Sequence, residues 1–291
     1  MSVRALVLGG FGINCERETA AALRLAGAEV RTRHLNRLLH GQDAIHEHDL
    51  LVFPGGFSFG DDLGSGRVLA SKLRYSRLPS GRCLLDEIER FLGDGKRVLG
   101  ICNGFQILVK AGLLPSGSAG VGAERWPQTA TLTHNDSGHF EDRWVHLRVN
   151  PRSPARWLHA LDAFDVPVRH GEGKLVIVDD AVRARVVELG LDGLHYVDAD
   201  GEPTASYPAN PNGSALCCAG LTDASGQVLG LMPHPEAFLS LTNHPAWPLL
   251  RRTQTTVSDD GQGLHFFRAL VAACAPSTDE KPSALAGGSP C

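Results

Sequence analysis

The clearest structural signal in the chain is the stretch Arg97-Val98-Leu99-Gly100-Ile101-Cys102-Asn103-Gly104-Phe105-Gln106. Residues 97–101 form a short apolar run typical of a buried strand, and residues 104–111 have helical character. Almost no loop separates the two elements, so the turn at Cys102 is too tight for Cβ atoms on either side, where glycines stand. The pattern predicts a nucleophile elbow with cysteine in place of serine, at a helix N-terminus that favours a thiolate.

Short apolar strands alternate with helices in the first 115 residues. The strands are expected at 5–8, 29–32, 49–53 and 97–101, and the helices at 16–26, 85–92 and 104–111. This alternation predicts an α/β fold with a mainly parallel central sheet flanked by helices on both faces. Further strands are expected at 129–133, 144–149, 174–178 and 228–232, and a closing helix at 263–273. We expect one domain over residues 1–274 and a disordered tail over 275–291.

Composition excludes several classes of protein. The 291 residues carry a net charge of -4 and only 6% aromatic side chains, which argues against a nucleic-acid binder. No apolar run approaches the ~20 residues that a membrane helix needs. The N-terminus does not resemble a signal peptide, and the seven cysteines form no C-x-x-C pair. We therefore expect a reduced, cytoplasmic protein that binds neither membranes nor nucleic acid.

A thiolate nucleophile requires a base and a group that orients the base. The segment 232–236, Met-Pro-His-Pro-Glu, follows a predicted strand and should emerge at the same sheet edge as Cys102. Residues two apart in extended chain point the same way, so His234 and Glu236 can touch. The two prolines hold the segment extended. His234 is therefore the candidate base and Glu236 its orienting carboxylate.

A glycine-rich turn follows the strand at 49–53. Its backbone N–H groups can approach a ligand closely, and the N–H of Gly56 could form an oxyanion hole with the N–H of Asn103. Cys15 is a second cysteine at a helix start, but it lacks the elbow glycines. The run 46–49, His-Glu-His-Asp, offers metal-ligand residue types, but no second ligand cluster accompanies it; we therefore expect a polar surface loop there and no metal site.

The segments 100–106, 54–61 and 232–236 resemble the three signatures of class I (triad) glutamine amidotransferases. Their detailed form, together with 135–141, 170–174 and 210–214, is similar to one branch of that family. This branch is the glutaminase subunit, or domain, of phosphoribosylformylglycinamidine synthase in purine biosynthesis. The resemblance covers roughly residues 4–270 and implies the flavodoxin-like fold of the family.

The resemblance implies a Cys102–His234–Glu236 triad that hydrolyses L-glutamine. It also implies that Gln106 holds the substrate and that Asn212 and Gly213 contact its α-amino and carboxylate groups. The released ammonia would serve a separate synthetase subunit, with a small accessory subunit as a further expected partner. No cofactor is expected in this chain, which lacks a P-loop motif. ATP and Mg²⁺ would be used by the synthetase to amidate formylglycinamide ribonucleotide.

Two other interpretations stay open. The same elbow could serve a cysteine peptidase or a glyoxalase-like hydrolase, although neither is expected to carry Gln106 and the 210–214 segment. A regulatory pseudo-glutaminase without catalysis is disfavoured, because all three triad positions are filled.

Overall fold

The structure of the chain is a computed structural model that describes residues 2–115, 125–253 and 258–275. The expected disordered tail, 275–291, lies outside these ranges apart from Ala275, so both the tail and the domain limits stay predictions.

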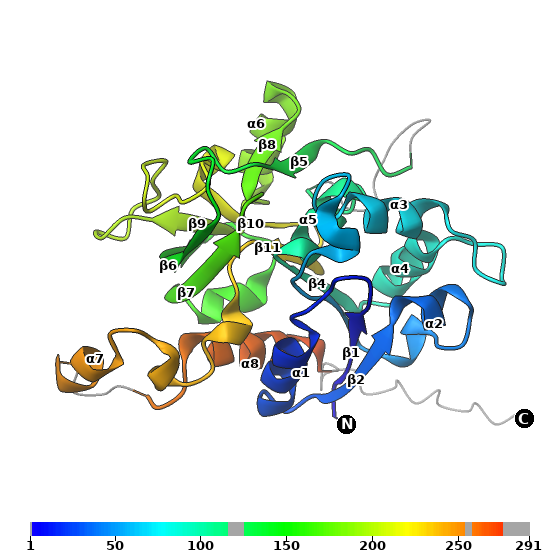
Figure 1. Cartoon of the computed structure of the whole chain (residues 1–291), viewed down its shortest axis with the longest axis horizontal. Helices are drawn as coiled ribbons and strands as arrows, with labels where there is room; N and C mark the ends of the chain where they lie inside the picture. The colour runs from blue at the N-terminus through cyan, green and yellow to red at the C-terminus, as the bar shows by residue number, and fades with distance from the viewer. Residues whose placement is uncertain (1, 116–124, 254–257, 276–291) are drawn as a thin grey trace, which may run out of the picture.

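A nine-stranded sheet runs through the described part of the chain (Figure 1). Its strands, in spatial order, are β2 (Glu29–His34), β1 (Arg4–Gly9), β3 (Leu50–Phe53), β4 (Arg97–Ile101), β11 (Val228–Leu231), β10 (Cys218–Thr222), β9 (Leu194–Val197), β6 (Glu141–Val149) and β7 (Ala163–His170). A separate antiparallel pair joins β5 (Ala130–Thr133) to β8 (Lys174–Ile177).

The first half of the sheet is parallel. Strands β2, β1, β3, β4 and β11 pair in parallel, and β3 and β11 are buried throughout. Such strands read as continuous apolar runs because both of their faces are covered. From β11 onward, each pairing through β10, β9, β6 and β7 is antiparallel. The predicted α/β fold is confirmed, and the sheet that it contains is mixed.

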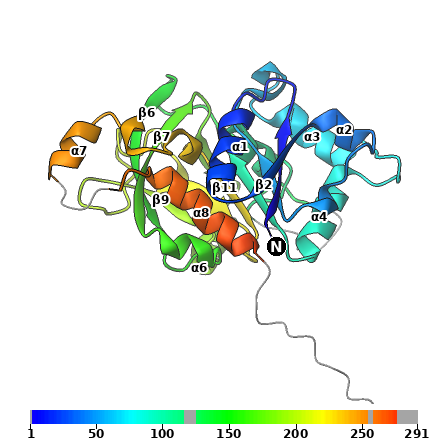
Figure 2. The same ribbon diagram turned by 90° about the horizontal axis from the view of Figure 1, so that it is seen from below.

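Helices pack against each other on the sheet. Their bounds are α1 (Glu16–Leu25), α2 (Leu35–Leu39), α3 (Arg67–Tyr75), α4 (Leu84–Gly93), α5 (Asn103–Lys110), α6 (Asp180–Leu189), α7 (Trp247–Thr253) and α8 (Gln262–Cys274). Helix α1 packs against α8, and α3 packs against both α4 and α5. Figure 2, which views the molecule from below, shows α1 and α8 next to each other on the near side of the sheet. Among the described helices, none is both long and apolar enough to cross a bilayer.

The register of the parallel strands brings three loops to one edge of the sheet. Phe53 at the end of β3 lies opposite Gly100 in β4, and Ile101 lies opposite Leu231 in β11. The turns that follow β3, β4 and β11 therefore meet at their carboxyl ends, where parallel sheets bind ligands. These are the turns that carry Gly56, Cys102 and His234.

Candidate active site

Cys102 stands on a strained turn between β4 and α5. Its backbone has φ 51° and ψ -105°, a conformation that residues with a side chain rarely adopt. A Cβ at Gly104 would lie 1.9 Å from the carbonyl oxygen of Phe53, and one at Gly100 would lie 2.7 Å from the backbone of Gly104. Only glycine fits at both positions, so the nucleophile elbow predicted from the sequence is present.

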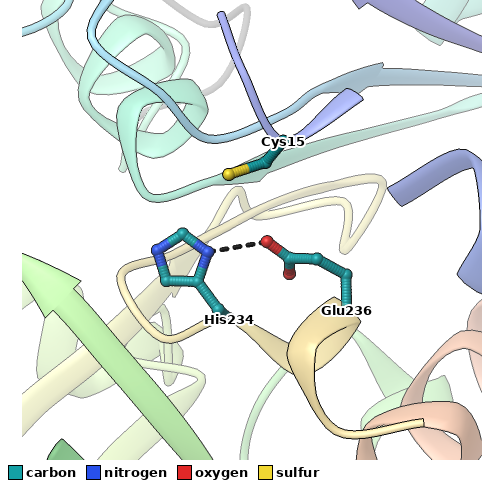
Figure 3. A group of neighbouring side chains, drawn as sticks. All are labelled: Cys15, His234 and Glu236. Atoms are coloured by element: carbon teal, nitrogen blue, oxygen red, sulfur yellow. Dashed lines mark hydrogen bonds and ion pairs between the residues drawn. The ribbon is translucent and has the colours of Figure 1, made fainter. Parts of the chain in front are cut away.

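His234 and Glu236 form the buried pair that the sequence predicts. The Nδ1 atom of His234 lies 2.6 Å from Oε1 of Glu236, and the two side chains are 4% and 2% exposed (Figure 3). The backbone N–H of His234 donates to the carbonyl of Pro167 at 2.8 Å, which fixes the segment against β7. Since Glu236 accepts the Nδ1 hydrogen, the other ring nitrogen is left for the reaction.

Charge and burial act in opposite directions on His234. Burial alone would lower the pKa of the imidazole. The negative charges of the Glu236 carboxylate and of a Cys102 thiolate outweigh burial and raise that pKa well above its usual value. The site thus favours a protonated imidazole next to the sulfur, the state that accompanies a thiolate nucleophile.

Gly56 lies beside Cys102 on the loop after β3. Its φ is 143°, and a Cβ there would come 2.6 Å from the carbonyl oxygen of Gly12. Gly56 and Cys102 line the same cavity, of about 180 Å³. Asn103 is the first residue of α5, where a helix has no internal acceptor for the N–H groups. Both N–H groups proposed for the oxyanion hole therefore come from backbone next to the sulfur.

Gln106 links the elbow to the opposite wall of the cavity. Its Oε1 accepts from the side-chain amide of Asn103 at 2.9 Å, and its Nε2 donates to the carbonyl of Glu172 at 2.5 Å. The Oδ1 atom of Asn103 in turn accepts from the N–H of Ser58 at 3.3 Å. Gln106 also lines the cavity with Cys102. The network joins the elbow, the Gly56 loop and the 170–173 turn.

His170 is a buried base in the cavity wall whose role the sequence did not define. Its Nδ1 lies 3.0 Å from Oδ1 of Asn135, which also accepts the N–H of Gly173. Burial, with a smaller contribution from nearby His234, lowers the pKa of His170 to about 4. A neutral ring with its hydrogen on Nδ1 presents a bare Nε2, and no described residue donates to that buried atom.

Asn212 and Gly213 are not brought to this cavity. Asn212 is fully buried, its Nδ2 donates to the hydroxyl of Tyr196 at 3.2 Å, and its Oδ1 accepts from the N–H of Ser214 at 3.0 Å. The Ser214 hydroxyl donates to the carbonyl of Gly173 at 3.3 Å. The segment therefore packs against the 170–173 turn on the side away from the cavity. The contact with glutamine expected for these two residues stays an untested prediction, and their position outside the cavity lining does not favour it.

Sequence reasoning missed the charged groups of the cavity wall. Besides the residues above, the cavity is lined by Asp61, Arg169 and Glu172. Asp61 has φ 55° and Oδ1 buried without a hydrogen-bond partner among the described residues, and burial raises its pKa. A carboxylate on strained backbone, with one oxygen buried in a cavity, is a signal of function, but the sequence alone does not reveal this conformation.

A comparison with models of known protein families shows the general family of the chain. The sequence model of the CobB/CobQ-like glutamine amidotransferase domain matches residues 2–273. The chain therefore belongs to the glutamine amidotransferases, as the elbow and the His–Glu pair indicate.

Individual relatives show to which branch of the glutamine amidotransferases the chain belongs. The chain is 41% identical to "Phosphoribosylformylglycinamidine synthase subunit PurQ" of Dehalococcoides mccartyi, over 92% of this chain and 96% of that one. It is 35% identical to human "Phosphoribosylformylglycinamidine synthase", over 81% of this chain but 18% of the human protein. The solved structure of PurLQS from Thermotoga maritima matches with a TM-score of 0.64 and 29% identity, covering 94% of this chain and 100% of that one. The chain belongs to the family of PurQ subunits of phosphoribosylformylglycinamidine synthase.

Proposed function

We propose that this chain is the glutaminase subunit of phosphoribosylformylglycinamidine synthase and acts in the cytoplasm. It hydrolyses glutamine and supplies ammonia for the amidation of formylglycinamide ribonucleotide. The observation that carries the proposal is the elbow cysteine beside the buried His234–Glu236 pair, in a chain that covers 96% of a PurQ relative. A peptidase or glyoxalase-like chemistry has no comparable support from the relatives.

The reaction is an acyl transfer in two steps. The Cys102 thiolate attacks the carboxamide carbon of glutamine, and the N–H groups of Gly56 and Asn103 hold the oxyanion. Protonated His234 gives its proton to the departing nitrogen, which leaves as ammonia. His234 then takes a proton from water, whose oxygen attacks the thioester and releases glutamate and the thiolate. Each proton transfer contributes about 10²–10⁴-fold and each oxyanion donor about 10²–10³-fold.

Charged side chains in the wall of the cavity recognise the α-ammonium and α-carboxylate groups of glutamine. Asp61 and Glu172 offer negative charge for an α-ammonium group, and Arg169 offers positive charge for an α-carboxylate. Asp61 accepts from the Ser65 hydroxyl at 2.8 Å, which leaves its Oδ1 for the ligand. Gln106 orders this wall through its bond to the Glu172 carbonyl.

The partners follow from the family. The matching Thermotoga maritima structure is of PurLQS, a name that covers more than the PurQ subunit. We infer that this chain docks on a synthetase subunit and a small accessory subunit, and that the synthetase uses ATP and Mg²⁺ to activate its substrate. The ammonia made at Cys102 would pass to that second active site.

Measuring glutamine hydrolysis by the isolated chain, and again with the synthetase, ATP and formylglycinamide ribonucleotide, tests the proposal. We expect low activity alone and at least tenfold activation in the complex, which requires only about 1.4 kcal/mol of differential binding. The glycine-flanked Gly56 loop is the element that binding would order. Full activity without the partner, unchanged on its addition, would indicate a free-standing hydrolase. No glutamine hydrolysis in either state would indicate a pseudo-glutaminase.

A further inference from the structure

Cys15, the residue that precedes α1, lies against the catalytic pair. Its Sγ, one ring nitrogen of His234 and one carboxylate oxygen of Glu236 all lie within 4.8 Å of one another. Figure 3 shows the Cys15 side chain above the His234–Glu236 pair. The mechanism of glutamine hydrolysis gives this thiol no step, so its position calls for another explanation.

One buried oxygen of the cluster has no hydrogen-bond partner among the described residues. It is Oε2 of Glu236, whose side chain is 2% exposed. Nε2 of His234 also lacks such a partner, but it lies on the side of the ring away from Glu236 and serves proton transfer in the reaction. Unpaired buried polar atoms are costly, and they are often completed by an ion or water. This oxygen is an observation independent of the cysteine, and it belongs to a residue of the same cluster.

Gly55, next to the cluster, leaves space for the side chains of Cys15 and His234. A Cβ on Gly55 would lie 2.9 Å from Cε1 of His234 and 3.2 Å from Sγ of Cys15. Glycine at this position therefore lets the thiol and the imidazole share one small space. Cys15 is half-buried, and its thiol donates to Oδ1 of Asn14 at 3.3 Å. The cluster is thus reached from the side of the Asn14–Cys15 turn.

Thiolate, imidazole and carboxylate are the three donor types that zinc takes from proteins. Zn–S of ~2.3 Å and Zn–N of ~2.0 Å at a tetrahedral angle place ligand atoms roughly 3.5 Å apart. Ligand atoms up to 4.8 Å apart would move inward, whereas Nδ1 of His234 and Oε1 of Glu236, 2.6 Å apart, would move apart to admit the metal. A site with three protein ligands keeps a fourth position for water.

We propose that Cys15, His234 and Glu236 form an inhibitory site for Zn²⁺. The metal displaces the thiol proton of Cys15 and the Nδ1 proton of His234 to solvent, and takes lone pairs from the sulfur, from Nδ1 and from the Glu236 carboxylate. With the metal on Nδ1, His234 can no longer form the imidazolium that protonates the departing nitrogen, so glutamine hydrolysis stops until the metal is removed. Zinc here is a reversible inhibitor and not a cofactor. The inhibition rests on the proposed function, whereas the binding does not.

Zinc binding is measured on the full chain by competition with a chromophoric chelator. We expect one Zn²⁺ per chain and at least tenfold weaker binding in Cys15→Ala, with Cys15→Ser as a second variant in case the first does not fold. Cys217→Ala is the matched control, because Cys217 is also a half-buried free cysteine and lies outside the cluster; its affinity should equal that of the wild type. Equal affinity in the wild type and both folded Cys15 variants would overturn the proposal.

A second arm separates this inference from the catalytic assignment. Cys102→Ala, which should have no glutaminase activity, should still bind Zn²⁺ with an affinity within about threefold of the wild type. With Co²⁺ as the probe, Cys102→Ala should keep a thiolate-to-cobalt charge-transfer band that Cys15→Ala loses. A band that depends on Cys102 and not on Cys15 would refute the site, whatever the glutaminase assay shows.

Discussion

His234 and Glu236, two residues apart, are joined side chain to side chain by a bond of 2.6 Å in almost complete burial. The intervening Pro235 begins a single 3₁₀ turn, so the prediction that the prolines hold this segment extended is wrong; the His234 backbone is bonded to β7 through Pro167. The imidazole is thereby held in one orientation, with its second nitrogen free for proton transfer.

This arrangement predicts unequal costs for the two substitutions. His234→Ala removes the proton carrier from both steps and should lower kcat/KM for glutamine on the order of 10³-fold or more. Glu236→Gln keeps a hydrogen-bond acceptor beside Nδ1 and should cost less. Steady-state kinetics of the two variants in the reconstituted complex compare them. A larger loss in Glu236→Gln would refute the roles assigned to the two residues.

Glutamine should be recognised through its α-ammonium group by Asp61. Asp61→Asn is expected to raise KM for glutamine about tenfold or more, the cost of losing a bond to a charged group. It should leave kcat/KM for glutaramate, which lacks the amino group, nearly unchanged. The neighbouring exposed Asp62→Asn is the control and should affect neither substrate. A parallel loss for both substrates would assign Asp61 a purely structural role.

Stability should depend on pH through His170. Burial and nearby His234 lower the pKa of the folded imidazole to about 4, against 6.5 for the unfolded chain. Between these values the unfolded chain binds a proton that the folded chain does not, so stability falls as the pH drops from 6.5 to 4. The loss approaches about 3 kcal/mol.

Urea unfolding at a series of pH values measures this contribution. His170→Gln should flatten the slope of the unfolding free energy across that window. His159→Gln, at an exposed position in the same half of the chain, should keep the wild-type slope. If His170→Gln keeps the wild-type slope as well, His170 is not the group responsible.

The elbow glycines should be sensitive to a single methyl group. Gly104→Ala places a Cβ 1.9 Å from the Phe53 carbonyl oxygen and should lower the free energy of unfolding by about 3 kcal/mol. Gly93→Ala at the end of α4 meets nothing within 4 Å and should be neutral or stabilising by up to about 1 kcal/mol. Chemical denaturation compares the two, and equal effects would contradict the close packing at the elbow.

The parallel half of the sheet could be predicted from the sequence because its strands are buried on both faces. β4 and β11 read as unbroken apolar runs, and the elbow glycines mark where β4 ends. β7 was missed, since it alternates polar residues with apolar ones and contains Pro167. Proline and charge are typical of an edge strand, the place that β7 takes.

The residues of the site also fall into a group that the sequence predicts and a group that it does not. Cys102, His234 and Gly56 follow strand ends, so the order of strands alone brings them together. Asp61 and Glu172 come from loops, and their approach depends on backbone angles and side-chain bonds that the sequence does not specify. For the same reason, the sequence did not reveal that Asn212 lies behind the cavity wall, with its own amide already paired.

The most direct test of the assignment of Cys102 is the synthetase reaction of a complex that contains Cys102→Ala, measured with either glutamine or ammonia as the nitrogen donor. Only glutamine hydrolysis needs the thiolate, so glutamine-dependent synthesis should be lost while ammonia-dependent synthesis stays at the wild-type rate. In the wild type, a glutamine-like electrophile should label Cys102. Equal loss of both syntheses, or labelling at Cys15 instead, would contradict the assignment of Cys102 as the nucleophile.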